Sequence, residues 1–296
     1  MNLPPGEWLP LAVDASTRRY WRGTLDGAPV LLAHFGEDRD GLERFVFVRD
    51  LFARHGIDVP AIFSAPAGEP YVIQEFVDGR PLSKMRWPSS LAGRLLETAR
   101  RIGAITEWGA GPEMLELDEA RLHFELAFFR LHFLEGLLNM RPHEGLDDAL
   151  GALAAEMASY PQVLAHRDFH SENLLMARSE RVVVVDFQDA LMAPRCYDAA
   201  SLAVDPYRRR DRKVDSVVRS SWTASTGASE VEFSRTALQR ALKALGTFGY
   251  QIVRRKRARY VQYVRPQAEA ALDLLPAAPV SLEPLAACLR AATALA

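Results

Sequence analysis

The sequence has little of what marks several large protein classes. It contains only two cysteines, Cys196 and Cys288, among 296 residues. Two cysteines are too few for a disulfide framework, and such scarcity is typical of a reducing compartment. No stretch approaches the roughly 20 uninterrupted apolar residues that a membrane-spanning helix needs, and the first ten residues lack the basic-then-apolar pattern of a signal peptide. We therefore expect a cytoplasmic protein that does not associate with membranes.

Net charge is also small. The chain has 36 Lys and Arg against 38 Asp and Glu, for a formal charge of -2, which argues against a nucleic-acid partner for the molecule as a whole. Hydrophobic residues make up 49% of the chain, which excludes disorder. At roughly 150 residues per domain, the length predicts about two domains or lobes. The charge is uneven, because residues 205–296 hold 16 cations and only 8 anions. Lysine is rare, with four in the chain and none before Lys84.

The first part of the chain has the pattern of strands and one helix. Apolar residues at helical spacing predict a helix over Gly41–His55, with Gly56 as its stop. Apolar or aromatic runs predict four strands, and Asp26-Gly27 predicts a tight hairpin turn between the first two. The expected strands are Arg18–Thr24, Pro29–His34, Ala61–Ser64 and Tyr71–Phe76. A linker with Gly79, Pro81 and Pro88 follows over Val77–Pro88, so we expect an N-terminal lobe of residues 1–78.

The rest of the chain, residues 79–296, is mainly helical by its pattern, and we expect it to form a second lobe. Helices are expected over Leu91–Trp108, Leu117–Asn139 and Asp147–Ser159, and from Tyr197 to the end. Short apolar runs predict strands over Gln162–Ala165, Leu174–Ala177 and Val182–Val185. Phe124, Phe128, Phe129 and Phe133 fall at helical spacing, and we expect them in the core.

Chemistry-bearing residues concentrate after the predicted strand Gln162–Ala165. His166-Arg167-Asp168 comes first, Asn173 follows five residues after the aspartate, and Asp186 follows a run of four valines. This order is the one used in kinase phosphoryl transfer. Asp168 would accept a hydrogen bond from the substrate hydroxyl, and Asn173 and Asp186 would hold Mg²⁺ against the nucleotide phosphates, since oxygen ligands suit that hard cation. In the alternative interpretation, Asp168 is a turn residue and Asp186 caps a strand.

These residues give the sequence a resemblance to the aminoglycoside phosphotransferase and choline kinase-like family. Protein kinases usually carry Lys two residues after the catalytic Asp, whereas this chain has His170, as the small-molecule kinases do. Two further segments are similar to one branch, the bacterial anomeric N-acetylmuramate/N-acetylglucosamine kinases of cell-wall recycling. They are Asp186–Ala190 with Tyr197–Leu202, and Asp14–Arg22.

The resemblance implies a fold and a set of roles. The fold would be α+β and two-lobed like a protein kinase, with a small β-rich N-terminal lobe and a larger, mainly helical C-terminal lobe. The cofactors would be ATP and Mg²⁺, the acceptor a small molecule, most of all a sugar, and the protein a monomer. Asp168 would be the catalytic base, with Asn173 and Asp186 as metal ligands. His166 and Asp198 would support the catalytic loop, although Asp198 is equally well explained as a carboxylate favoured by a helix dipole. The nucleotide would be bound by Ser16, Thr17, Arg18 and Arg19 and by a hinge of Gln74, Glu75, Phe76 and Val77.

One departure from the kinase pattern concerns a lysine. Protein kinases pair a third-strand Lys with a Glu of the next helix, but the strand Val30–His34 has no Lys, so Glu43 lacks its usual partner. Arg18, Arg19 or Arg22 could supply the missing charge, and His34 could do so only if protonated. The gap favours a nucleotide-binding pseudokinase, whereas intact Asp168, Asn173 and Asp186 oppose it.

The acceptor is open at this level. The runners-up to an amino sugar are an aminoglycoside, choline and homoserine. The basic balance of residues 205–296 disfavours a polycationic aminoglycoside and suits a carboxylated sugar. The runs Arg208–Lys213 and Arg254–Arg257 fit either solvated helix faces or a pocket for an anionic substrate.

Overall fold

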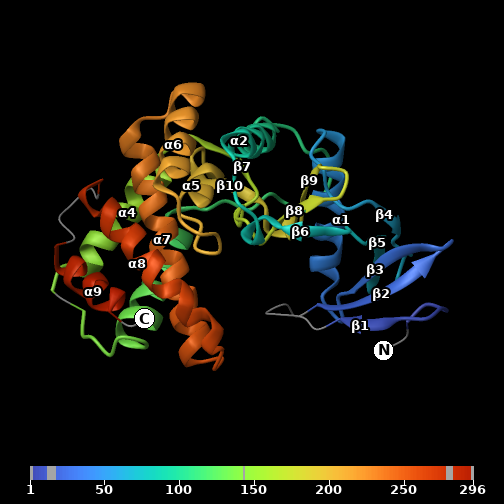
Figure 1. The fold of residues 1–296 in the computed structure, drawn as a ribbon, viewed down its shortest axis with the longest axis horizontal. Helices are drawn as coiled ribbons and strands as arrows, with labels where there is room; N and C mark the ends of the chain where they lie inside the picture. Colours follow the sequence, from blue (N-terminus) through green and yellow to red (C-terminus); the bar gives the residue numbers. More distant parts are fainter. Residues whose placement is uncertain (1–2, 12–17, 143, 278–282, 295–296) are drawn as a thin grey trace.

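The computed structural model describes residues 3–11, 18–142, 144–277 and 283–294. Figure 1 shows a β-rich lobe at the N-terminal end of the molecule and a mainly helical lobe at the other end, with short strands between them. The predicted two-lobed α+β architecture is therefore confirmed. Among the described residues, no helix is long and apolar enough to cross a membrane.

A five-stranded antiparallel sheet with strand order β1-β2-β3-β5-β4 forms the N-terminal lobe. The hairpin between β2 and β3 turns at Asp26 and Gly27, whose φ angles are 49° and 79°, as the Asp-Gly pair predicts. The prediction missed β1, because its three residues are all exposed and give no apolar pattern. The elements are β1 (Leu9–Leu11), β2 (Arg19–Leu25), β3 (Ala28–His34), α1 (Arg39–Arg54), β4 (Ile62–Ser64) and β5 (Tyr71–Glu75).

Helix α1 packs against this sheet and matches the predicted helix. Asp38 caps its first turn by accepting a hydrogen bond from the Gly41 N–H. Its buried face consists of Phe45, Val48, Leu51 and Phe52. Burying each such side chain contributes roughly 1.5–3 kcal/mol, so this face fixes the helix at the boundary between the two lobes.

Two small sheets lie between the lobes. The first contains β6 (Gly79–Pro81), β8 (Leu174–Ala177) and β9 (Val182–Val184), and the second contains β7 (Gln162–Ala165) and β10 (Leu191–Pro194). Strand β6 lies inside the segment predicted to be a linker, so that prediction is wrong for Gly79–Pro81. A Cβ at Gly79 would lie 2.7 Å from the Met176 carbonyl oxygen. The absence of a side chain at Gly79 thus permits the close pairing of β6 with β8, which the composition of this Gly- and Pro-containing segment did not predict.

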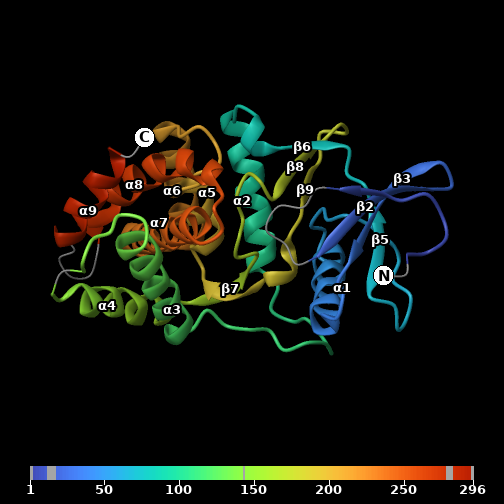
Figure 2. The same ribbon diagram turned by 90° about the horizontal axis from the view of Figure 1, so that it is seen from below.

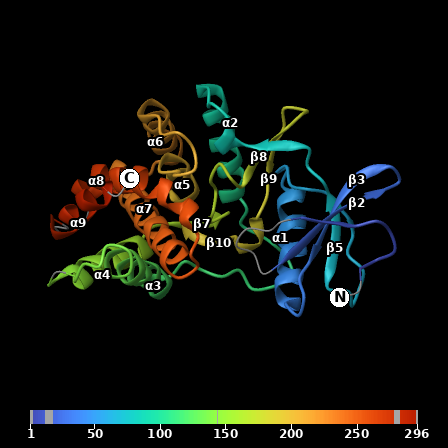
Figure 3. The same ribbon diagram turned by 60° about the horizontal axis from the view of Figure 1, so that its bottom comes forward.

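Helices make up most of the C-terminal lobe. The long helix α7 packs against α3, α5 and α8 (Figure 2), and Figure 3 shows strands β7 to β10 between α7 and the N-terminal lobe. The helices are α2 (Ser89–Gly103), α3 (Glu119–Phe129), α4 (Leu146–Ala158), α5 (Tyr197–Ala203), α6 (Arg212–Thr226), α7 (Glu230–Val253), α8 (Val261–Leu274) and α9 (Glu283–Thr293), with a π-helix η2 (Arg130–Glu135) after α3 and 3₁₀ turns η1 (Leu82–Lys84), η3 (Phe187–Asp189), η4 (Ala258–Tyr260) and η5 (Leu275–Ala277).

Two predictions about the helices need correction. Helix α2 ends at Gly103 rather than at Trp108. Of the four phenylalanines expected in the core, Phe129 and Phe133 are fully buried, but Phe124 is 67% exposed. The exposure of Phe124 follows from tertiary packing, because α3 presents only one side to α4 and α7.

Candidate active site

The loop between β7 and β8, residues 166–173, is fixed from two sides. The side chain of Asp198, at the start of α5, accepts hydrogen bonds from the backbone N–H groups of His166 (2.7 Å) and Arg167 (3.1 Å). The His166 ring is fully buried, and its Nε2 lies 3.0 Å from the Val185 carbonyl oxygen. Arg167 has a φ of 78°, a strained value for a residue with a side chain. The bonds from Asp198 hold this loop in shape at the point where it presents Asp168.

Asp168 carries a fixed negative charge. Its Oδ1 lies 2.9 Å from Lys243 Nζ and 3.4 Å from Arg240 Nη2. Burial alone would raise the pKa of Asp168, but these two cations outweigh burial and hold that pKa well below its usual range. Both partners lie on α7, far along the chain, and were not predicted from the sequence. For Lys243 the signal in the sequence was the rarity of lysine, whereas Arg240 gave none.

A second acidic residue balances the other cations around the loop. Glu125 on α3 is buried and accepts hydrogen bonds from Arg167 (3.1 Å) and from the side-chain amide of Gln239 (2.8 Å). Arg240 stacks over the ring of Tyr197 at 4.8 Å and donates to its hydroxyl at 3.0 Å. The loop therefore rests on a connected network of charged side chains from α3, α5 and α7.

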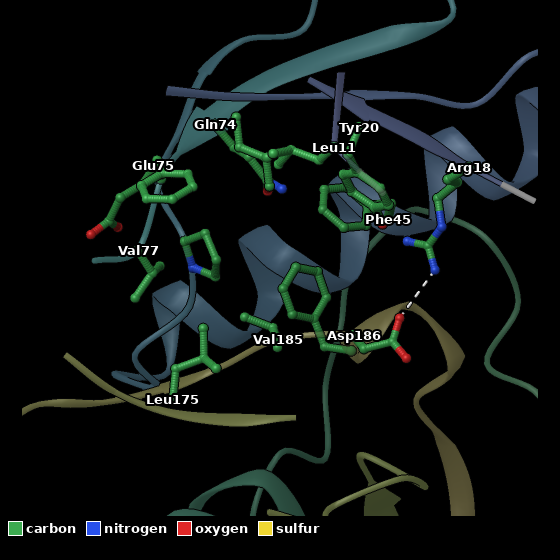
Figure 4. Close-up of a pocket in the computed structure, with 14 residues that line it drawn as sticks. Leu11, Arg18, Tyr20, Phe45, Gln74, Glu75, Val77, Leu175, Val185 and Asp186 are labelled. Atoms are coloured by element: carbon green, nitrogen blue, oxygen red, sulfur yellow. Dashed lines mark hydrogen bonds and ion pairs between the residues drawn. The ribbon is translucent and has the colours of Figure 1, made fainter. Parts of the chain in front are cut away.

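Asn173 lies at the end of the loop, and Asp186 is brought near it because the Val185 N–H donates to the Asn173 carbonyl oxygen at 2.9 Å. Asn173 donates its side-chain N–H to the Asp168 carbonyl oxygen at 3.0 Å, so the amide oxygen is the atom available to a cation. Asp186 has left-handed backbone angles, φ 60° and ψ 38°. Its Oδ1 accepts bonds from Arg18 (Figure 4) and Gln188, both at 3.1 Å.

The donor set fits Mg²⁺. One carboxylate and one amide oxygen are hard ligands, and Mg²⁺ is commonly bound by one or two carboxylates together with phosphate oxygens of the substrate. Within the described ranges, no group of three or more His, Cys, Asp or Glu could form a site by protein ligands alone. A cation at Asn173 and Asp186 would need further ligands from a nucleotide.

A cavity of about 320 Å³ opens between the lobes beside Asp186 (Figure 4). The predicted hinge residues Gln74, Glu75, Phe76 and Val77 line it, together with Leu175 and Val185 from the strands below. Gln74 is 5% exposed, and its Oε1 is a buried acceptor with no hydrogen-bond partner among the described residues. A flat ring that carries an N–H donor would fit this mainly apolar cavity.

The structure separates the predicted phosphate-binding residues. Arg18 lines the cavity, whereas Arg19 is exposed on β2 and Arg22 stacks on the Phe76 ring at 4.6 Å. Ser16 and Thr17 lie outside the described residues. His34 accepts a hydrogen bond from the Gly36 N–H, and burial lowers its pKa, so it does not supply a charge.

Arg44 is a further residue that sequence analysis missed. From α1 in the N-terminal lobe it donates to three carbonyl oxygens, those of Glu113, Gln188 and Ala190. Two of them belong to the chain directly after Asp186. The adjacent rings of Phe45 and Phe187 lie 5.0 Å apart. Arg44 rather than Glu43 is the residue of α1 that connects the two lobes at this point.

A smaller pocket of about 80 Å³ lies on the other side of Asp168. Arg240, Lys243 and Thr247 line it from successive turns of α7, and His170 and Tyr207 close it with rings 4.8 Å apart. Asp168 thus lies in the wall of a cationic pocket, and the loop that carries it also reaches the strand beside the larger cavity, because the Val185 N–H donates to the Asn173 carbonyl oxygen. The Arg208–Lys213 run does not form a helix face throughout, because Arg208 is 5% exposed and stacks on Trp87 at 4.9 Å.

Comparison with known proteins decides the family. The model of the phosphotransferase enzyme family matches residues 7–233. This chain belongs to that family. As a family member it is a phosphotransferase, that is, a kinase, as the sequence predicted.

Named relatives and solved structures agree with this assignment. The chain is 27% identical over 279 residues to the N-acetylmuramate/N-acetylglucosamine kinase of Pseudomonas aeruginosa, covering 88% of this chain and 81% of that one. It is 26% identical to the kinase of the same name from Neisseria meningitidis, covering 90% and 86%. A choline/ethanolamine kinase family protein from Mesorhizobium loti shares the fold with a TM-score of 0.57 and 18% identity, covering 99% and 93%. The ADP-bound aminoglycoside phosphotransferase APH(2'')-Ib shares the fold with a TM-score of 0.60 and 14% identity, and the match covers 90% of this chain and 94% of that one. The kinase-like fold is confirmed.

Proposed function

We propose that this phosphotransferase transfers the γ-phosphoryl group of Mg-ATP to the anomeric C1 hydroxyl of an amino sugar of the N-acetylmuramate/N-acetylglucosamine type. The observation that carries the proposal is the position of Asp168 in the wall of a cationic pocket, on a loop that reaches the nucleotide-sized cavity through the hydrogen bond from the Val185 N–H to the Asn173 carbonyl oxygen. The names of the relatives at 26–27% identity supply the acceptor class.

The site residues divide the work of the reaction. Asp168 orients the attacking hydroxyl and accepts its proton, and because cations hold its pKa low, it is ionised and ready to accept a hydrogen bond. Asn173 and Asp186 are the metal ligands, and Mg²⁺, when bound, offsets charge on the transferring group. His166 and Asp198 keep the loop in place. The hinge Gln74–Val77 holds the adenine ring.

Arg18 supplies the charge that the absent third-strand lysine would have given. It lines the nucleotide cavity and pairs with Asp186 at 3.1 Å. With Mg²⁺ held at Asp186, the Arg18 guanidinium would contact the nucleotide phosphates instead. Arg18 therefore serves as the partner of Asp186 before the nucleotide binds.

The charges of the acceptor pocket favour a sugar over the other acceptors. The acceptor pocket is the smaller pocket beside Asp168, and in its wall two cations, Arg240 and Lys243, outnumber one anion, Asp168. A like charge brought into such a small pocket costs binding energy. Aminoglycosides and choline are cationic, whereas N-acetylglucosamine is neutral and N-acetylmuramate carries a carboxylate. The charges of this pocket therefore support the proposal of a sugar acceptor.

The test is ADP release from Mg-ATP over a panel of acceptors, with phosphorus NMR of any product. The panel contains N-acetylmuramate, N-acetylglucosamine, another free hexose, an aminoglycoside, choline and homoserine. We expect a sugar 1-phosphate, and no turnover when EDTA removes the metal. Turnover of a cationic acceptor alone would overturn the sugar assignment. ATP binding without turnover of any acceptor would favour the pseudokinase interpretation.

A further inference from the structure

The charged network beside the catalytic loop contains three cations, Arg167, Arg240 and Lys243, joined to two anions, Asp168 and Glu125. The pairs are Arg167–Glu125 (3.1 Å), Arg240–Asp168 (3.4 Å) and Lys243–Asp168 (2.9 Å). Two further buried carboxylates, those of Asp198 and Asp205, accept hydrogen bonds from backbone N–H groups of the same loop. The three cations therefore differ in which of them still has N–H donors facing a pocket.

Lys243 is the member of this network that faces an incoming group. Arg240 is 7% exposed by its side chain and is already committed to the ring and hydroxyl of Tyr197. Arg167 is committed to Glu125. Lys243 is 17% exposed, lines the acceptor pocket, and has Asp168 as its side-chain hydrogen-bond partner within the described ranges. An ammonium has three N–H donors, so it can bind a further oxygen while it keeps Asp168.

We infer that Lys243 is a catalytic residue that binds the transferring phosphoryl group, an inference that rests on the proposed transfer at Asp168. The acceptor oxygen forms its bond to the γ-phosphorus, and the bond from that phosphorus to the bridging oxygen breaks, leaving its electron pair on ADP. The hydroxyl proton passes to Asp168. Neutralising Asp168 weakens its hold on Lys243, and the ammonium turns to the phosphoryl oxygens.

The movement of the Lys243 ammonium from Asp168 to the phosphoryl oxygens places a cation where negative charge appears in the reaction. Such an arrangement stabilises a transition state rather than a bound substrate. A lysine that served only as counter-ion to Asp168 would duplicate Arg240, which already pairs with that carboxylate.

Aluminium fluoride, added to Mg-ADP, tests the inference without any acceptor, because it mimics the transferring phosphoryl group. In the wild-type protein the mixture should raise the melting temperature above that with Mg-ADP alone. Lys243→Met should keep the rise in melting temperature that Mg-ADP alone produces and lose the additional rise that aluminium fluoride produces. Lys213→Met, at an exposed lysine at the start of α6, should keep both. A further increment that survives in Lys243→Met, or none in the wild-type protein, would overturn the inference.

Turnover with an accepted sugar gives a second readout. We expect Lys243→Met to lower kcat about 100-fold while KM for ATP changes by less than about threefold. Lys243→Arg should recover part of kcat, since it keeps the charge. The melting temperature of ligand-free Lys243→Met should fall only slightly, because Arg240 still pairs with Asp168. Equal kcat in Lys243→Met and wild type would refute the catalytic role of Lys243 and leave the acceptor assignment intact. No turnover of any sugar by the wild-type protein would refute the acceptor assignment, and the fluoride test would then decide on Lys243.

Discussion

Asp168 combines two properties at the scale of one residue. It sits on a loop whose backbone is fixed by Asp198, and its carboxylate is fixed by two cations of α7. A carboxylate with so low a pKa is a weak base. In phosphoryl transfer that weakness matters little, because the catalytic gain comes from positioning the hydroxyl and from stabilising charge. The role we assign to Asp168 is therefore mainly orientation.

Replacing Asp168 by Asn tests this role with almost no change of shape. We expect Asp168→Asn to lower kcat at least 1,000-fold and to leave the affinity for Mg-ADP within about twofold. It should also lower the free energy of unfolding by about 1–2 kcal/mol, because two cations lose a partly buried partner. Steady-state kinetics, calorimetric titration and urea unfolding measure the three effects. Near wild-type kcat would remove Asp168 from the mechanism.

Both thiols should be inert in the folded protein. Cys196 and Cys288 are buried, and burial, reinforced by Glu232, raises the pKa of Cys196 to about 12. Because thiolate forms only as the pH rises toward the pKa, about one Cys196 in 10,000 is ionised at pH 8. Titration with a disulfide reagent at pH 8 should count no reactive thiol in the native protein and two in guanidinium chloride. Rapid reaction of a native thiol would show that one of these sites opens.

Helix α7 is the element on which the site depends, since it carries both partners of Asp168 and crosses the centre of the helical lobe (Figures 1 and 2). It approaches α3 and the π-helix closely through two glycines. A Cβ at Gly246 would lie 2.6 Å from Phe129 Cα, and one at Gly249 would lie 2.3 Å from the His132 carbonyl oxygen. Both contacts are with backbone, which cannot move aside cheaply.

An alanine at Gly246 should therefore push α7 away from α3. We expect Gly246→Ala to lower the free energy of unfolding by about 3 kcal/mol and to lower kcat as well, because Lys243 lies on the same helix. The matched control is Gly93→Ala in α2, where a Cβ meets nothing within 4 Å. That change should stabilise the protein by about 0.5–1 kcal/mol through helix propensity. Urea unfolding compares the two, and equal effects would contradict the close approach.

For the whole molecule, the relation between the lobes is set near Asp186. Arg18 reaches Asp186 from the N-terminal lobe, and Arg44 holds the carbonyl groups of Gln188 and Ala190 from α1. The segment after Asp186 thus belongs to the C-terminal lobe by chain connection and to the N-terminal lobe by its hydrogen bonds. Nucleotide binding at this segment should depend on both lobes.

Arg44→Gln tests that dependence. The variant leaves three carbonyl acceptors without their donor, so we expect the free energy of unfolding to fall by about 1–3 kcal/mol. We also expect the affinity for Mg-ATP to fall about tenfold, because Asp186 loses the support behind it. Arg39→Gln, at an exposed position of the same helix, is the control for charge. Calorimetric titration and urea unfolding of both variants provide the measurement. Unchanged Mg-ATP affinity in Arg44→Gln would show that Arg44 does not support Asp186 as a metal ligand, whatever it contributes to stability.

Sequence and structure agree where the information is local. The hairpin at Asp26 and helix α1 follow from short spacings, and both could be predicted. The partners of Asp168 could not, because Arg240 and Lys243 lie 72 and 75 residues further along the chain. Only the packing of α7 brings them to the loop. Strand β6 was missed for a similar reason, since a Gly-Arg-Pro segment becomes a strand only when β8 offers it hydrogen bonds.

The scarcity of lysine has a practical consequence for chemical labelling. The chain before Lys84 offers no lysine amine at all, although that part forms most of one wall of the nucleotide cavity. Lys243 is the lysine that lines the pocket beside Asp168, and burial lowers its pKa below the usual value, which leaves more free amine near neutral pH. A nucleotide carrying an acyl phosphate should therefore modify Lys243 selectively and leave the N-terminal lobe unmodified, so that peptide mass mapping would report occupancy of the cleft at one residue.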